Sequence, residues 1–500
     1  MRRSEAPVGA PRRPFATAVR VAVALGAVVA LAAVVQLIGR GEEPATAPGG
    51  STLDRTLADP DGNGELEPGP GEPLLDRTEL APASSPRREL ARFAQISDAH
   101  VRDEESPGHP AVLDRLGPPF ASTFRPHEAL TTQVLAATVE AVNRFRPESV
   151  VITGDLVDNP QQNELDQALA VLGGGRVAPD SGAPGYEGFQ SASNADPFFY
   201  RPDVDAPRRP GLLASAERPF AALGLVAPWY PVAGNHDLLV QGEVAPTPRI
   251  LALATGSEAL AELDPELEVP EDERALSPEV IERVLGRGVP GRTLRVAPDP
   301  ERRQLDAEAV LDRLREASGH GGRGSLLDYA FDIGLSVRAI VLDTVRRDAG
   351  SGGRVRPAQL DWLARQLDAA GERHVVVFTH QPLRTSVGGQ QVLALLDREP
   401  RVLAAVAGHT HNNRIDPRRS DAGGYWLIET ASLADFPQQA RAFRLVETAP
   451  DRVALETWML DHTGSPLAGT ARELAFLDAQ GGRPQGSAGE RDDRNVRLHR

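Results

Sequence analysis

The chain has 500 residues, of which 41% are hydrophobic and 25% charged, an ordinary composition for a globular protein with a large core. Its formal net charge of −16 argues against non-specific binding of nucleic acid, although bound metal ions would still let a pocket accept a phosphorylated small molecule. The chain contains no cysteine, which excludes disulfides, thiolate metal sites and a cysteine nucleophile.

The N-terminal segment predicts on which side of the cytoplasmic membrane the protein lies. An arginine-rich start, residues 1–20, precedes an apolar run, residues 21–38, which is just long enough to cross a bilayer. This order predicts a cytoplasmic n-region, a transmembrane anchor or signal segment, and a catalytic part outside the cytoplasmic membrane. Residues 12–15, Arg-Arg-Pro-Phe, resemble a twin-arginine export signal. Secretion after cleavage stays open, but Pro48 directly follows the small-residue site at 45–47 and favours a retained anchor.

Changes in amino-acid composition predict how the rest of the chain is divided into a linker, a folded domain and a tail. Residues 39–88 are rich in Pro, Gly, Ala and acidic residues, which predicts a flexible linker. The folded domain is expected over residues 89–465, with a loop-rich insertion at about 173–219 and a second insertion at about 241–324. The second insertion contains amphipathic pieces at 278–285 and 306–315, typical of a cap or subdomain. The polar tail, residues 466–500, is expected to be disordered.

Within that domain, short apolar runs alternate with helical patterns. Leu130, Val134, Ala137 and Ala141 recur at helical spacing, and a similar pattern follows Pro357. Buried strands that alternate with helices predict an α/β fold of the layered α+β kind. The runs occupy residues 93–96, 149–153, 229–233, 337–342, 375–379 and 402–407.

Polar residues follow five of these runs directly, at the edge where open α/β sheets bind ligands. Each fragment alone is a weak signal, because an Asp-x-His triplet or a lone histidine is more often structural. Their joint occurrence in this order is informative. If the first segment is extended, Asp98 and His100 point the same way and reach one cation. The segments are Asp98-Ala-His100, Gly154-Asp155-Leu-Val-Asp158, Gly234-Asn235-His236-Asp237, His380 and Gly408-His409-Thr-His411.

These five segments resemble the motifs of the calcineurin-like metallophosphoesterase superfamily, and the resemblance covers about residues 90–461. It implies a central β-sheet sandwich flanked by helices, with a dinuclear metal site at the C-terminal ends of the strands. Asp155 would bridge the two ions. The first ion would be held by Asp98, His100, Asp155 and His411, and the second by Asp155, Asn235, His380 and His409.

Ligands of this kind, without sulfur, suit two divalent ions of manganese, iron or zinc. Such a pair can activate a bridging hydroxide for attack on a phosphate monoester or diester. His236 is the one motif imidazole not used as a ligand, and we expect it to stabilise the transition state and protonate the leaving oxygen. The resemblance implies that Asp158 orients His236. It also argues against a tyrosinate-iron centre, because purple acid phosphatases carry tyrosine where this chain has Asp158.

Several polar residues receive no functional role from the sequence. Asp343 is interpreted as a turn or helix cap. Arg102 is interpreted either as a phosphate ligand or as a partner of Asp103 or Glu104. The histidines outside the motifs, such as His109, are expected to be surface or capping residues. A non-catalytic, metal-stabilised binding module on the same scaffold remains the alternative function. Substrate identity and oligomeric state stay open.

Overall fold

The computed structural model describes residues 50–117, 120, 122–262, 293–348, 350–462, 464–482 and 486–500. The predicted membrane segment at 21–38 and the amphipathic piece at 278–285 lie outside these ranges. Among the residues described, no helix combines the length and apolar character needed to cross a membrane. The described chain belongs to one compact unit, Pro48–Arg500.

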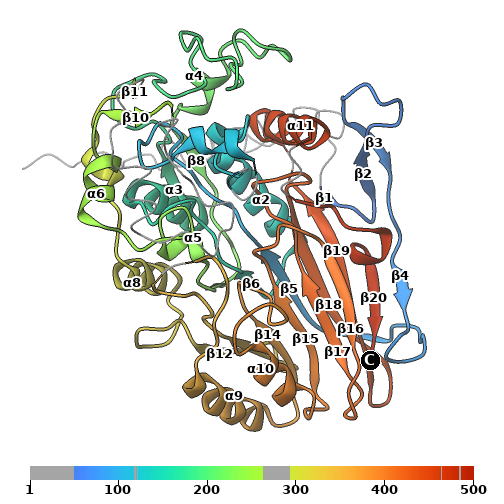
Figure 1. Cartoon of the computed structure of the whole chain (residues 1–500). Helices are drawn as coiled ribbons and strands as arrows, with labels where there is room; N and C mark the ends of the chain where they lie inside the picture. Colours follow the sequence, from blue (N-terminus) through green and yellow to red (C-terminus); the bar gives the residue numbers. More distant parts are fainter. Residues whose placement is uncertain are drawn as a thin grey trace, which may run out of the picture. The chain divides into compact units, whose positions relative to one another are not determined.

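Two mixed β-sheets form the centre of this unit (Figure 1). In the first, β5, β6 and β9 run parallel, whereas β18, β19 and β20 continue the sheet in antiparallel fashion. Its described strands, in spatial order, are β4 (Leu75–Arg77), β20 (Val496–His499), β19 (Arg452–Asp461), β18 (Gln439–Ala449), β5 (Arg88–Ile96), β6 (Ser149–Ile152) and β9 (Trp229–Pro231), with β1 (Gly50–Ser51) beside β19.

The second sheet is parallel in its centre and antiparallel at both edges. Its described strands, in spatial order, are β12 (Tyr329–Ile333), β13 (Val337–Val341), β14 (His374–Phe378), β15 (Val402–Ala407), β17 (Tyr425–Glu429) and β16 (Arg414–Arg418). β15 is apolar and buried along its whole length, and β14 is so after its first residue, as expected of strands covered on both faces. Each of the six predicted runs overlaps one of the strands in these two sheets.

The core lies between the two sheets. Phe93 of β5 stacks on Phe443 of β18 in its own sheet, with ring centroids 4.7 Å apart. It also meets Phe378 of β14 edge to face at 6.1 Å, which joins the two sheets. All three rings are fully buried. Packing of one sheet face against the other brings the C-terminal ends of β5, β6, β14 and β15 together, and this is where the metal-ligand motifs stand.

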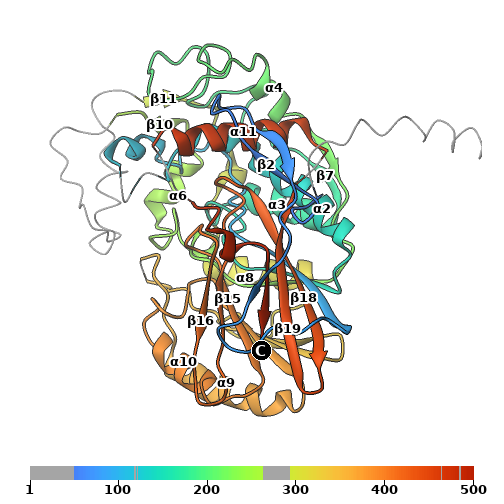
Figure 2. The same ribbon diagram turned by 90° about the vertical axis from the view of Figure 1, so that its right-hand side faces the viewer.

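Helices cover the outer faces of the sheets. Among the helices of the described chain, α2 packs on β18 and β19, and α9 packs on β13 and β14. Figure 2 shows α2 and α3 at one end of the strands and α9 and α10 at the other. The larger helices are α2 (Thr131–Phe145), α3 (Gln162–Gly173), α8 (Ala307–Ser318), α9 (Pro357–Ala370), α10 (Gly389–Leu396) and α11 (Pro466–Gln480). The predicted layered α/β fold with a β-sandwich is therefore confirmed.

Shorter elements lie in the connections. The insertion at 173–219 is mostly loop, as predicted, and the insertion at 241–324 contributes α8 at the predicted place. The short helices are α4 (Leu212–Ala216), α5 (Asn235–Leu238) and α6 (Pro248–Ala254). The strand pairs are β2 (Arg55–Ala58) with β3 (Glu67–Pro70), β7 (Gly175–Val177) with β8 (Phe220–Ala222), and β10 (Glu258–Leu260) with β11 (Thr293–Arg295). The 3₁₀ turns are η1 (Ala111–Leu116), η2 (Glu128–Leu130), η4 (Pro300–Arg302) and η5 (Arg491–Asp493).

Two predictions of disorder are wrong for the described residues. The proposed linker at 39–88 contributes β1 and β4 to the first sheet from residue 50 onward, and Thr52 Oγ1 donates to the carbonyl of Met459. The proposed disordered tail forms α11 and β20, whose Val496 and Leu498 are fully buried. Both segments are polar on average, yet each places a few apolar side chains in register with the core. The folded unit therefore extends well beyond the predicted 89–465.

Candidate metal centre

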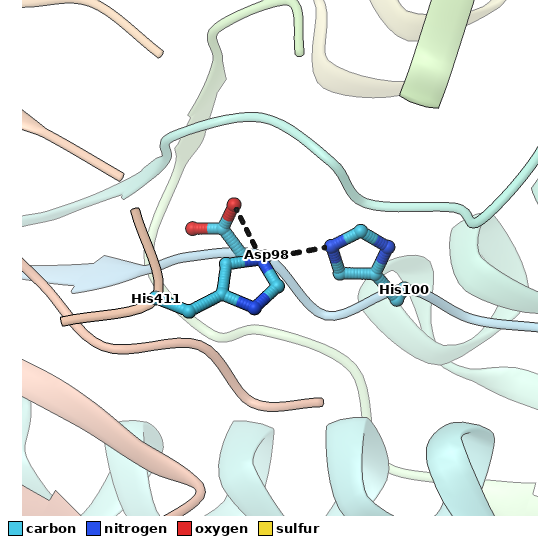
Figure 3. A group of neighbouring side chains, drawn as sticks. All are labelled: Asp98, His100 and His411. Atoms are coloured by element: carbon cyan, nitrogen blue, oxygen red, sulfur yellow. Dashed lines mark hydrogen bonds and ion pairs between the residues drawn. The ribbon is translucent and has the colours of Figure 1, made fainter. Parts of the chain in front are cut away.

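All seven predicted ligands converge at the C-terminal ends of the strands. A carboxylate oxygen or ring nitrogen of each of Asp98, His100 and His411 lies within 4.8 Å of the others, and the same holds for Asp155, His380 and His409. Figure 3 shows the first three side chains turned toward one another. The Nε2 atoms of His100 and His411 are 3.2 Å apart, and Nε2 of His380 lies 3.0 Å from Oδ1 of Asn235.

Asp155 links the two groups through a single oxygen. Its Oδ2 atom lies 3.1 Å from Nε2 of His380 and 3.8 Å from Nε2 of His100. Its Oδ1 atom is held elsewhere, because it accepts the backbone N–H of His236 at 2.8 Å. The side chain is almost fully buried. One carboxylate oxygen therefore faces both sets of ligands, as the bridging position requires.

Three of the imidazoles predicted as ligands are oriented by their other ring nitrogen. Nδ1 of His380 donates to the carbonyl of Thr153 at 2.8 Å, and Nδ1 of His411 meets Oδ2 of Asp435 at 2.5 Å. Nδ1 of His100 lies 2.8 Å from Oδ1 of Asp158. When Nδ1 carries the donated proton, Nε2 keeps its lone pair free for a metal ion, and such partners are typical of metal-binding histidines.

The backbone at these positions is strained. Asp98, His100, Asp155, His409 and His411 all have positive φ, between 44° and 68°. The left-handed region costs a non-glycine residue about 1–3 kcal/mol, so such residues persist where the surrounding structure enforces them. The prediction that Asp98 and His100 share an extended backbone is therefore wrong. Tight turns after the strands, rather than the alternation of a strand, direct these side chains.

Glycines allow the close packing of the motifs. A Cβ atom on Gly154 would lie 2.5 Å from Nδ1 of His380, and one on Gly408 would lie 2.1 Å from Oγ of Ser97. Gly154 also has a φ of +91°, which disfavours any other residue. The glycines therefore let strands from two sheets approach within the radius of a metal site.

The charges of the cluster suit cations. Burial alone would raise the pKa of Asp98 and of Asp155, but the neighbouring imidazoles outweigh it and hold both pKa values below the ordinary range. Burial opposes protonation of His411 and His380, yet nearby carboxylates raise the pKa of His411 to about 10 and that of His380 to about 9. These two imidazoles therefore hold protons where a metal ion would replace them.

His409 differs electrostatically from the other imidazoles. Burial and the positive charge of His380 lower its pKa to about 3, so its ring is neutral. A neutral imidazole needs no proton removed before it binds a metal. Its backbone N–H donates to the carboxylate of Asp98, at 3.0 Å to Oδ1, which ties the second group of ligands to the first.

His236 lies beside the predicted ligands without joining either ligand set of the prediction. Its ring centroid is 4.6 Å from that of His100, and its side chain keeps 19% of its surface exposed. Nδ1 of His236 donates to the backbone carbonyl of Asp158 at 2.8 Å, because a carbonyl can only accept. This bond fixes the tautomer of the ring and leaves Nε2 as the nitrogen available to a substrate.

The structure changes the role expected for Asp158. Its carboxylate binds His100 at 2.8 Å and also contacts Nη1 of Arg102 and Nδ1 of His109, each at 3.2 Å. The nearest carboxylate oxygen is 3.5 Å from Nδ1 of His236, farther than the Asp158 carbonyl. The backbone of Asp158 orients His236, whereas its side chain orients His100. The resemblance implied that Asp158 orients His236 as an acidic residue, whereas the group in hydrogen-bonding contact with His236 is the carbonyl of Asp158.

Two residues outside the motifs had been interpreted differently. Arg102 is buried and pairs with Asp158 and with Glu128 rather than with Asp103 or Glu104, while its role as a phosphate ligand stays a prediction. His109, expected at the surface or at a cap, is 2% exposed and lies between Asp158 and Glu164. Asp343 acts as the predicted turn residue, because its carboxylate accepts the N–H groups of Leu327 and Val345.

Asp435 was missed because no motif contains it. It follows β17 and accepts two hydrogen bonds from Arg125, at 2.7 and 3.3 Å, in addition to its contact with His411. Burial would raise its pKa, but the Arg125 guanidinium and His411 hold that pKa well below the ordinary range. The signal available in the sequence was only its position after a buried strand.

The carboxylate, amide and imidazole donors, with the bridging oxygen of Asp155, fit two divalent ions of the manganese, iron and zinc class. Fold and site together define a metal-dependent phosphoesterase. The family model described as calcineurin-like phosphoesterase matches residues 91–413, and the chain belongs to this family, whose members use a dinuclear metal site. The assignment of individual ligands to each ion stays a prediction.

One curated relative is the manganese-dependent ADP-ribose/CDP-alcohol diphosphatase of Xenopus tropicalis, which is 28% identical over 116 residues. The match spans 21% of this chain and only 32% of that relative.

Similar solved structures include a dimetal phosphatase from Danio rerio, with a TM-score of 0.39, 12% identity, and coverage of 75% of this chain and 98% of that one. PhoD has a TM-score of 0.30 and 11% identity, over 84% of this chain and 81% of PhoD. The sulfate thiohydrolase SoxB of Thermus thermophilus has a TM-score of 0.30 and 14% identity, over 81% of this chain and 62% of SoxB.

Proposed function

We propose that this protein hydrolyses phosphate monoesters or diesters at a pair of divalent metal ions. The observation that carries the proposal is the position of Asp155 Oδ2 between Nε2 of His380 and Nε2 of His100. When bound, two such ions supply positive charge for the phosphoryl oxygens and lower the pKa of water. The buried carboxylates and oriented imidazoles described above would hold these ions.

His236 is proposed as the general acid of the reaction. Its Nδ1 proton is fixed by the Asp158 carbonyl, and its partly exposed ring lies beside His100 at the edge of the cluster. A protonated Nε2 can then donate to the leaving oxygen, which matters most when that oxygen is a strong base. A donor at this position would also stabilise the charge that develops on the leaving oxygen in the transition state.

The general-acid role is tested by replacing His236 with alanine and comparing two kinds of ester. We expect esters with poor leaving groups to slow far more than activated aryl esters, whose leaving oxygen needs no proton. The metal content of the variant should equal that of the wild type. Equal slowing of both esters, at unchanged metal content, would remove the proposed role.

The substrate must fit the space beside the cluster. A cavity of about 840 Å³ borders Thr410 and Asn412, which flank the ligand His411 in the chain. Its lining includes Arg384 and Arg414, each of which pairs with Asp416. A cavity of this size has room for a group larger than phosphate itself. We propose that it receives the remainder of the substrate.

The substrate class is tested with a panel of phosphomonoesters, phosphodiesters and diphosphate-linked nucleotides. The relative named for ADP-ribose and CDP-alcohols supports the inclusion of the last group and of manganese. The full chain would be reconstituted separately with Mn²⁺, Fe²⁺ and Zn²⁺. Hydrolysis that requires one of these metals supports the proposal. A protein that holds two metals and is inert toward the whole panel would favour the non-catalytic binding module instead.

We further propose that the catalytic domain lies outside the cytoplasmic membrane, as a membrane-anchored or secreted protein. The arginine-rich residues 1–20 followed by the apolar residues 21–38 support this location. Replacement of Arg12 and Arg13 by lysine distinguishes twin-arginine export from other routes, because that pathway reads the arginine pair. Protease protection of the domain in intact cells would contradict an external location.

A further inference from the structure

Three carboxylates form a second acidic cluster that shares no residue with the metal centre. Glu105 lies in the loop after β5, Asp180 follows β7 in the first insertion, and Glu217 directly follows α4. One carboxylate oxygen from each lies within 4.8 Å of the other two. Glu105 is 3% exposed and Glu217 is 8% exposed, whereas Asp180 is partly exposed, so two of the three carboxylates are shielded from water. Like charges in such a site repel strongly unless a cation separates them.

One loop fixes all three side chains through its backbone. The N–H of Glu187 donates to Oε1 of Glu105, the N–H of Gly185 donates to Asp180, and the N–H of Tyr186 donates to Glu217. Three consecutive N–H groups therefore hold one oxygen of each carboxylate. The chain thus positions the three carboxylates around a common centre and leaves their other oxygens for a further partner.

Two of those oxygens are orphaned. Oδ1 of Asp180 and Oε1 of Glu217 are enclosed, and neither has a hydrogen-bond partner among the described residues. A buried carboxylate oxygen without a partner is unfavourable, because it has given up its hydrogen bonds to water and gained none in return. Because the rest of the pocket is so well organised, the orphaned oxygens indicate that a ligand completes it.

Arg302 approaches the cluster without donating a hydrogen bond to it. Nη2 of Arg302 lies 3.8 Å from Oε2 of Glu105, beyond hydrogen-bonding distance. Its Nε donates to Asp103 at 3.0 Å, and its Nη atoms donate to Ala297 and Ser181, each at 2.8 Å. Burial accordingly raises the pKa of Glu105 to about 8 and that of Glu217 to about 7. Either protons or a cation must therefore supply the missing positive charge at neutral pH.

We propose that Glu105, Asp180 and Glu217 bind a calcium ion that ties the first insertion to the loop after β5. All the donors are carboxylate oxygens, and this favours a hard cation over the manganese, iron or zinc expected at the imidazole-rich centre. Calcium binds oxygens at about 2.3–2.6 Å, so its ligands can lie up to about 5 Å apart, in agreement with the cluster. The ion would hold the segment that carries Arg102, the partner of Asp158, in place.

Calcium uptake by the manganese-loaded full chain tests this site. The protein is freed of calcium on a chelating resin, saturated with Mn²⁺, and dialysed against ⁴⁵Ca²⁺. We expect the wild type to take up about one Ca²⁺ per chain beyond its manganese, with a rise in the melting temperature. Glu217→Gln and Asp180→Asn should bind calcium at least about tenfold more weakly, since each loses a charged ligand. Glu308→Gln, on the exposed surface of α8, is the matched control.

Manganese content and basal hydrolysis distinguish a variant that has lost the calcium site from a variant that has misfolded. Both variants should keep the manganese content and basal hydrolysis of the wild type, because neither residue belongs to the metal centre. If Glu217→Gln does not fold, the uptake of the wild type and of Asp180→Asn, which is partly exposed, still decides the outcome. Absence of calcium uptake by the wild type, or unchanged uptake by a folded variant, overturns the proposal in favour of protonated carboxylates.

Discussion

Oδ2 of Asp155 lies 3.1 Å from Nε2 of His380, while Oδ1 of the same carboxylate accepts the backbone N–H of His236. The orientation of this carboxylate is therefore set before any ion binds. A neutral amide in its place would lose the charge that both ions require, although it would fit the same space.

Asp155→Asn should accordingly remove metal from both positions rather than from one. We expect the variant to retain fewer than two metals per chain and to lose at least about 10³-fold in kcat/KM, because positioning and charge are lost together. Elemental analysis of the purified protein and steady-state kinetics measure the two effects. Asp361→Asn, at an exposed position of α9, is the control. A variant that keeps two metals and most of its activity contradicts the bridging role.

Asp435→Asn should weaken metal binding without touching a ligand. The carboxylate holds Nδ1 of His411 at 2.5 Å and is itself held by Arg125. Loss of such a partner typically costs 10- to 100-fold in metal affinity, and we expect about that change here. Competition with a chelator of known affinity measures it. An affinity equal to that of the wild type would show that the contact does not support the metal centre.

Asp158→Asn separates the two possible roles of this residue. Because its carboxylate orients His100 and its carbonyl orients His236, the variant should lose about 10- to 100-fold in metal affinity. At saturating metal, the dependence of rate on the leaving group should match that of the wild type, since the carbonyl is unchanged. If the variant instead behaves like His236→Ala, the carboxylate would be the group that supports the general acid.

Metal binding should release protons. His380 and His411 have pKa values raised to about 9 and 10, so both are protonated in the metal-free protein at pH 7 and must lose a proton to bind through Nε2. The carboxylates of Asp98 and Asp155 have lowered pKa values and are already ionised at that pH. Apparent metal affinity should therefore rise as the pH rises from about 6 to about 9.

Calorimetry in buffers with different ionisation enthalpies measures this release, and we expect about two protons per chain at pH 7. Asp435→Asn provides an internal comparison, because it removes the negative charge that helps to raise the pKa of His411. The number of protons released should then fall. Binding enthalpies that do not depend on the buffer would contradict protonation of these imidazoles.

The sequence predicted those parts of the site that have a local signal. Asp98, Asp155 and His409 each stand directly after a buried strand, and the order of the strands in the sheets brings these ends together. Their left-handed backbone had no comparable signal, because positive φ in Asp and His is enforced by tertiary contacts. Asp435 could not be identified from the sequence for a related reason, since its role depends on contacts with Arg125, which lies 310 positions away in the chain.

The ends of the folded unit were predicted poorly, because the average composition of a segment does not show how its few apolar residues are spaced. In β20, only Val496 and Leu498 must face the core for the strand to join β19, and the residues between and around them are polar. α11 similarly buries Ala468, Ala471 and Leu474 at helical spacing within a polar segment. Small numbers of apolar residues at the correct period therefore outweigh a composition typical of disorder.

Gly242→Ala should disturb the site from outside the ligand set. Gly242 has a φ of +68°, and a Cβ atom there would lie 2.3 Å from Nδ2 of Asn235 and 2.5 Å from Cδ2 of His236. Both side chains must move to admit the methyl group, and a displacement of about 1 Å in a catalytic group can cost about 10²-fold in rate. We therefore expect kcat/KM to fall by about that factor.

Gly319→Ala is the matched control, because Gly319 has nearly the same φ, +72°, yet nothing lies within 4 Å of the added Cβ. Both variants should lose about 1 kcal/mol of stability from the strained backbone, measured by urea unfolding, but only Gly242→Ala should lose activity. Equal activity in the two variants would show that the packing of Gly242 against Asn235 and His236 does not position them for the reaction.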